Sequence, residues 1–164
     1  MKKIEPINIM KKFSLFEKKW TPQIIGELNE QYVKVCKLKD DFVWHSHENE
    51  DELFMVFKGT LLMDFRDQRT VEVKEGEILI VPKGVEHRPH TNGEIVFNLL
   101  FEPKTTSHTG NVETEMTIKE LDEWYWSMEN ILNHNQKHYI EFMRYQYSGI
   151  TDFINTAYNN LNEE

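Results

Sequence analysis

The chain has 164 residues, which suits one domain or one domain with an appendage, and 39% of them are hydrophobic, enough to bury a core. Its formal net charge of −9 argues against nucleic acid and anionic membrane surfaces as partners. The single cysteine, Cys36, excludes an intrachain disulfide and lies in an alternating run, where we expect it to be a small buried residue. Apolar runs are shorter than the ~20 residues of a membrane span and no secretory signal follows Met1, so we expect a cytoplasmic protein.

The first 22 residues predict an N-terminal helical arm. Ile9, Phe13 and Phe16 recur at helical spacing, and Pro22 ends any helix before it. We therefore expect a short amphipathic helix that packs against the main body.

Residues 23–112 predict a β domain, because short strand-like runs alternate with turn residues and no helical pattern intervenes. Asn92-Gly93 is the strongest hairpin signal among the turns, since both residue types accept a positive φ. The pattern favours an antiparallel sandwich or barrel. The expected strands are Gln23–Leu28, Gln31–Lys39, Phe42–His47, Leu53–Phe57, Thr60–Arg66, Thr70–Lys74, Glu77–Val81, a segment around His87, and Glu94–Glu102.

Residues 113–164 predict a C-terminal arm followed by helices. Apolar residues from Met128 to Leu161 recur mostly every three or four positions, which is an amphipathic helical stripe. Such a stripe must dock, on its own barrel or on a second subunit. We expect a homodimer, with the outer sheet and the aromatic arm Trp124–Trp126 at its interface.

Four side chains in the β region suggest a metal site. His45 and His47 share one face of a strand, Glu52 follows as an oxygen donor, and His87 is the natural third nitrogen. Three imidazoles and one carboxylate suit a single Mn, Fe, Co, Ni, Cu or Zn ion. On these residues alone a solvated acidic loop over 48–52 is an equally open alternative.

Two motifs resemble those of the cupin superfamily. His45-Ser46-His47-x4-Glu52-x6-Gly59 is similar to the first motif, G-x5-H-x-H-x3–4-E-x6-G. Gly76-x5-Pro82-x-Gly84-x2-His87 is similar to the second, G-x5-P-x-G-x2-H-x3-N. The sequence departs from the family at Lys39, which replaces the opening glycine, and at Thr91, which replaces the closing asparagine.

The resemblance implies a mainly β fold, an antiparallel double-stranded β-helix of jelly-roll type, with a short N-terminal helix and a C-terminal helical extension added here. It also implies that His45, His47, Glu52 and His87 face inward and hold one divalent transition metal. The run from Phe42 to His90 looks like that of uncharacterised single-domain bacterial cupins described as mannose-6-phosphate isomerase-like.

Other residues are weaker candidates for the pocket. His90 is a possible pocket or substrate contact, although a position near solvent at the end of a strand accounts for it better. Phe54 and Val56 lie two and four positions after Glu52, so in a strand their side chains point to the same face, and they are expected to line the pocket. His108 is expected at the surface, and Trp44 is expected to pack between the sheet and the N-terminal helix.

The fold class leaves the function open, because cupins host several chemistries. One hypothesis is a metalloprotein that acts on or binds a small polar molecule, such as a sugar-phosphate isomerase or a metal-dependent dioxygenase. The alternative is a non-catalytic small-molecule binding or sensor module in the same barrel. No nucleic-acid or membrane partner is expected.

Overall fold

The computed structural model describes residues 4–66 and 70–121, which all belong to one compact unit, residues 1–125. The described residues form one short helix and eight strands: α1 Ile9–Phe13, β1 Gln23–Leu28, β2 Gln31–Leu38, β3 Glu52–Lys58, β4 Thr60–Phe65, β5 Thr70–Lys74, β6 Ile78–Val81, β7 His87–His90 and β8 Val96–Pro103. The expectations for the helical stripe and the aromatic arm fall outside the described residues. No helix among the described residues is long and apolar enough to cross a bilayer.

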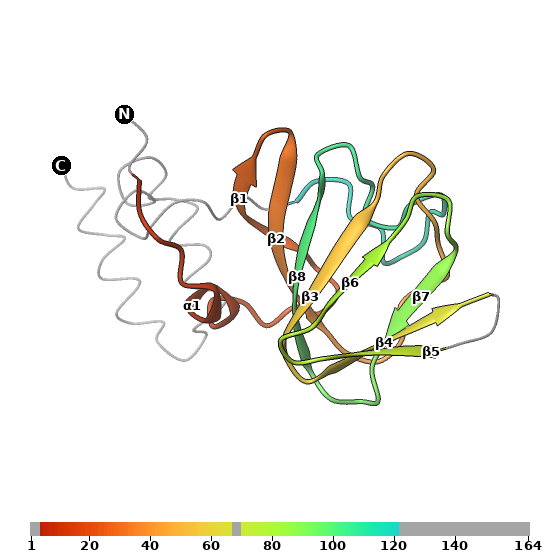
Figure 1. Cartoon of the computed structure of the whole chain (residues 1–164), viewed down its shortest axis with the longest axis horizontal. Coiled ribbons are helices and arrows are strands. Elements are labelled where there is room, and N and C mark those ends of the chain that lie inside the picture. The colour runs from red at the N-terminus through yellow and green to blue at the C-terminus, as the bar shows by residue number, and fades with distance from the viewer. Residues whose placement is uncertain (1–3, 67–69, 122–164) are drawn as a thin grey trace, which may run out of the picture. The chain divides into compact units, whose positions relative to one another are not determined.

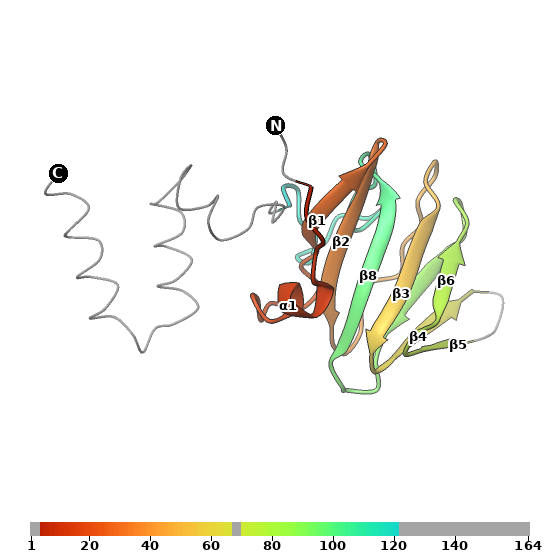
Figure 2. The ribbon, with the colours of Figure 1, turned by 60° about the vertical axis from the view of Figure 1, so that its left-hand side comes forward.

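The strands form two antiparallel sheets that face each other (Figure 1). The larger has the order β1-β2-β8-β3-β6, and Figure 2 shows these strands side by side. The smaller has the order β5-β4-β7. Sequence neighbours are often not sheet neighbours, since β8 lies between β2 and β3. This arrangement confirms the predicted double-stranded β-helix.

The core lies between the sheets because the strands alternate buried and partly exposed residues. On β8, Val96, Asn98, Leu100 and Glu102 are buried while the residues between them are not. Strand β3 shows the same alternation from Glu52 onward. Side chains of alternating residues point to opposite faces of a sheet, so these buried positions all face the interior.

The N-terminal arm covers part of the outer face of the larger sheet. The helix is shorter than expected: Asn8 caps it, and it ends at Phe13. Phe16 follows the helix but is still buried with Phe13, whose ring stacks on Phe97 of β8 at 4.7 Å between centroids. Helical spacing thus identified the buried residues correctly but overestimated the helix length.

Two local predictions are wrong. Phe42–His47 is not a regular strand, because only Asp41 and His45 form bridges there, with His90 and His87. Asn92-Gly93 does not close a hairpin: β7 pairs with β4, whereas β8 pairs with β2 and β3. The two-residue hairpin turn with positive φ at both positions is Asn29-Glu30, which joins β1 to β2.

Candidate metal centre

The segment that carries His45 and His47 runs beside β7. His45 and His87 exchange two backbone hydrogen bonds, at 3.0 and 2.9 Å, and the amide of Gly84 donates to the carbonyl of His47 at 2.6 Å. Between its two bridges the segment advances four residues, from Asp41 to His45, while β7 advances three. The segment therefore carries one extra residue, which acts like a β-bulge and interrupts the hydrogen bonding between the segment and β7. Bulges of this kind often change the direction of side chains beside functional sites.

Four side chains converge inside the barrel. Glu52 comes from the start of β3 and His87 from the start of β7, and their carboxylate and imidazole lie 3.1 Å apart, from Oε2 to Nε2. The same Oε2 lies 3.1 Å from Nε2 of His47. The ring of His45 is 4.3 Å from that of His87. The sequence therefore identified four residues that the fold does bring together.

The donor set fits a divalent transition metal. One ligand atom from each of the four residues lies within 4.8 Å of the others, and all four residues are buried. Nitrogen and oxygen ligands sit about 2.0–2.2 Å from such an ion, so two ligands of one ion are at most about 4.4 Å apart. The spread of 4.8 Å is therefore close to the widest separation of two ligands that one ion allows.

Backbone carbonyls fix the imidazole rings. Nδ1 of His45 donates to the carbonyl of Val43 at 3.0 Å, and Nδ1 of His87 donates to that of Val85 at 2.9 Å. Because a carbonyl only accepts, each ring carries a proton on Nδ1 and directs Nε2 toward the cluster.

Burial and electrostatic contacts favour a neutral ring at His45 and an ionised carboxylate at Glu52. Burial, with His87 nearby, lowers the pKa of His45 to about 4. Burial alone raises the pKa of Glu52, but contacts with His47 and His87 outweigh it and hold that pKa well below its usual range. Metal ligands must be deprotonated, and these are the protonation states that a metal requires.

The remaining predicted pocket residues divide into two groups. Phe54 is buried and meets the ring of His87 edge-on at 6.3 Å, and Val56 lies in the core beyond it. His90 points to the other face of β7, where Nε2 lies 3.2 Å from Asp64. The structure therefore does not bring His90 to the cluster.

The segment after β8 covers the cluster. A Cβ at Gly110 would lie 2.2 Å from the carbonyl oxygen of Ser46 and 3.3 Å from the ring of His45. Asn111 exchanges hydrogen bonds with Ser46, at 3.0 Å in each direction. His108 is partly buried against Phe42, whose ring meets His45, so the surface position expected for His108 is wrong.

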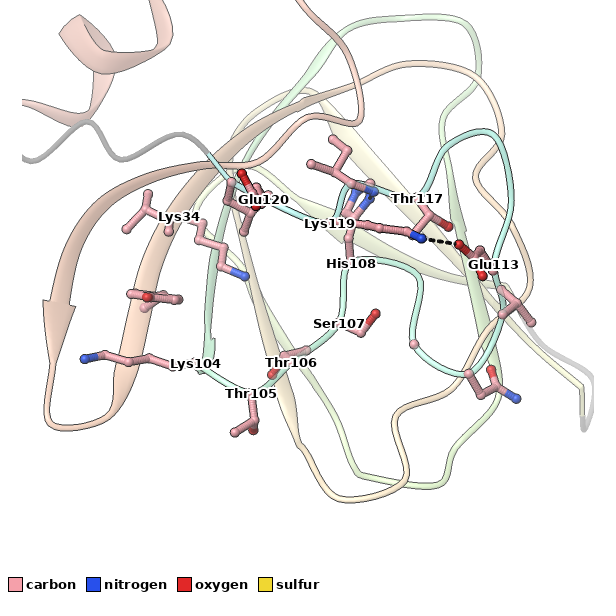
Figure 3. Close-up of a pocket in the computed structure, with 17 residues that line it drawn as sticks. Lys34, Lys104, Thr105, Thr106, Ser107, His108, Glu113, Thr117, Lys119 and Glu120 are labelled. Carbon is pink, nitrogen blue, oxygen red and sulfur yellow. Dashed lines mark hydrogen bonds and ion pairs between the residues drawn. The ribbon is translucent and has the colours of Figure 1, made fainter.

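Residues of that segment line a cavity of about 780 Å³ (Figure 3). Lys34 of β2 borders it on one side, and His108 and Thr117 border it on the other. Its lining is rich in hydroxyl and amino groups, from Tyr32, Lys104, Thr105, Thr106, Ser107 and Lys119. Gly110 belongs both to this lining and to the wall of the cluster.

Sequence reasoning missed a second buried carboxylate. Glu102 ends the inward-facing row of β8 and forms an ion pair with Lys34, and both residues are almost fully buried. Burial and the nearby Glu52 raise the pKa of Glu102. A charged residue at an inward position of an alternating strand was the available signal. Trp44 was also misplaced, since its ring lies 3.9 Å beneath the guanidinium of Arg66.

Fold and cluster together define a small double-stranded β-helix with three histidines and one glutamate at its centre. The Cupin domain family matches residues 35–101 of this chain. The uncharacterized protein YdbB of Bacillus subtilis is 39% identical over 80 residues, which are 49% of this chain and 70% of YdbB. The chain belongs to the cupin family.

Solved structures agree with this assignment. A cupin-2 domain protein from Shewanella frigidimarina is 43% identical with a TM-score of 0.58, over 60% of this chain and 94% of that one. Protein NMB1881 from Neisseria meningitidis is 30% identical with a TM-score of 0.56, over 61% of this chain and 100% of that one.

Proposed function

We propose that this cupin binds one divalent transition metal through His45, His47, Glu52 and His87, and binds a small polar molecule beside it. One observation carries the proposal: four buried ligand atoms lie within 4.8 Å of one another. Burying three imidazoles and a carboxylate together costs free energy, and coordination of a cation offsets that cost. A bound metal supplies Lewis-acid or redox chemistry.

Elemental analysis of the purified protein tests the metal site. We expect about one transition metal per chain, and a sharp loss in His87→Ala, because removing one of four ligands removes much of the binding free energy. His90→Ala is the matched control, since it changes a histidine of the same strand that faces away from the cluster. Wild-type protein that takes up none of Mn, Fe, Co, Ni, Cu and Zn contradicts the proposal.

The cavity supports a small polar ligand. Its volume of about 780 Å³ suits a small molecule, and its hydroxyl and amino groups match a sugar, a sugar phosphate or a hydroxy acid. Thermal-shift screening of these three classes, with and without metal, is the test. A compound that stabilises the protein and is converted supports an enzyme, and one that is bound unchanged supports a binding module. If no compound of these classes raises the melting temperature, the polar-ligand proposal fails.

We also propose that the chain forms a homodimer through the part of the outer face of the larger sheet that the N-terminal arm leaves exposed among the described residues. Ile78 and Ile80 of the edge strand β6 are 56% and 55% exposed. Leu53 and Met55 of β3 pair with them and continue the apolar surface. A second copy related by a two-fold axis covers such a face and the adjoining free edge of the sheet.

A further inference from the structure

Lys34 and Glu102 form a charged pair deep in the barrel. Both lie on neighbouring strands of the larger sheet, 68 positions apart in the chain, and the ammonium group donates to Oε1 of Glu102. Lys34 is 2% exposed and Glu102 is 3% exposed. Replacing a buried ion pair by apolar side chains is often neutral or stabilising, so the presence of this pair points to a role other than stability.

The strand register places this pair next to the proposed metal ligand Glu52. Leu53 of β3 pairs with Phe101 of β8, so the preceding residue, Glu52, lies opposite Glu102. Both carboxylates face the interior, because directly opposed residues share a face of the sheet. The second carboxyl oxygen of Glu102, Oε2, is buried and has no hydrogen-bond partner.

Glu52 is therefore bordered on two sides. His47 and His87 approach its Oε2 at 3.1 Å, and Glu102, anchored by Lys34, lies across the strand boundary. Glu102 is not among the four residues whose ligand atoms converge, so any effect it has on a metal acts through Glu52.

We propose that Glu102 and Lys34 are positioning residues that hold the carboxylate of Glu52 in the orientation for metal binding. This inference rests on the metal site proposed above. Partners that orient metal ligands in this way typically contribute about 10- to 100-fold to metal affinity. Lys34 also lines the cavity, so the chain of contacts Lys34–Glu102–Glu52 runs from the cavity wall to the cluster.

The decisive variant is the double substitution Lys34→Met and Glu102→Leu. It removes both buried charges together, so the metal-free protein is expected to melt close to the wild type. The dissociation constant for Zn²⁺ or Mn²⁺, measured by competition with a chromophoric chelator, is expected to rise about 10- to 100-fold. A purely structural pair would change the melting temperature instead and leave the dissociation constant unchanged.

Two single variants sharpen the test. Glu102→Gln keeps an acceptor for Lys34 and offers an amide N–H to the carboxylate of Glu52, so its metal affinity is expected to stay close to that of the wild type. Lys37→Met is the matched control: Lys37 is a buried lysine of the same strand, but it bonds to Phe16 and Glu17 in the N-terminal arm. Its metal affinity is expected to be unchanged.

The outcomes separate the two proposals. Wild-type protein that binds no metal overturns the proposed function. A wild type that binds metal, with a double variant that binds it equally tightly, overturns only the positioning role, as does a Glu102→Gln protein as weak as the double variant. If the double variant does not fold, Glu102→Asp replaces it: the shorter side chain withdraws the carboxylate from Glu52, and an unchanged dissociation constant again overturns the inference.

Discussion

Replacing Gly110 with alanine tests how closely the segment after β8 is packed on the cluster. Gly110 has a φ of 53°, and an added Cβ would lie 2.2 Å from the carbonyl oxygen of Ser46. Real contacts of this kind exceed 3 Å, so the backbone at one of the two sites must move by about 1 Å. The left-handed conformation costs alanine about 1–2 kcal/mol.

The displacement also strains two hydrogen bonds between Ser46 and Asn111, each contributing about 1 kcal/mol. We therefore expect the Gly110→Ala protein to lose about 3–4 kcal/mol in free energy of unfolding. The same movement displaces His45, whose ring is 3.3 Å from the new atom, so the metal affinity should fall as well.

Chemical denaturation of Gly110→Ala and of a second variant, Gly93→Ala, separates the cost of the steric clash from the cost of the backbone conformation. Gly93 also has a positive φ, 92°, but an added Cβ there meets no atom within 4 Å. It should show the conformational cost alone, so the two variants should differ by about 2 kcal/mol. That corresponds to about 4–8 °C in melting temperature for a domain of this size. Equal losses in the two variants refute the close packing of the segment on Ser46.

Three further predictions concern acid, burial and association. Because the imidazole ligands must be neutral, and burial lowers the pKa of His45 to about 4, metal content should fall as the pH drops toward that value, and metal retention that stays flat well below pH ~4 contradicts histidine ligands. Burial lowers the pKa of His108 to about 4. Between pH ~4 and ~6.5 the unfolded chain therefore binds more protons at His108 than the folded protein does. The stability that the neutral ring contributes is complete above this pH range and is lost as the pH falls through it. His108→Gln should reduce this acid sensitivity by up to about 3 kcal/mol in denaturation curves, and an unchanged pH profile contradicts the burial. Ile80→Glu should halve the mass measured by light scattering, whereas Leu28→Glu, at a residue of similar exposure on β1, should not; a dimeric Ile80→Glu protein moves the interface elsewhere.

The four cluster residues were predictable because two of them are local neighbours and the resemblance to the cupin motifs supplies the other two. Alternation along an extended segment puts His45 and His47 on one side, and motif spacing adds Glu52 and His87. The Lys34–Glu102 pair was not predictable in the same way, because it depends on β8 inserting between β2 and β3. Nothing in the local sequence specifies that order of strands.

The turns between strands were also only partly predictable from their residue types. Asn92-Gly93 has residues suited to a hairpin, yet the strands on either side of it enter different sheets. Asn29-Glu30 forms a two-residue turn with both residues at positive φ, although glutamate is not favoured there. Pairing of β1 with residues 31–35 of β2 outweighs the local preference of one residue.

The two departures from the family motifs meet at one turn, because Thr91 is hydrogen-bonded to Asp40, the residue after Lys39. The positive φ that a glycine would adopt falls on Asp40, at 60°, a conformation that short polar side chains tolerate. Thr91 supports this turn from both sides: its hydroxyl accepts from the amide of Asp40 at 2.9 Å, and its own amide donates to the carbonyl of Asp40 at 3.1 Å. The turn opens the segment that carries His45 and His47, so a hydroxyl in place of the motif's asparagine can compensate for the lost glycine and keep the two ligands in register with β7.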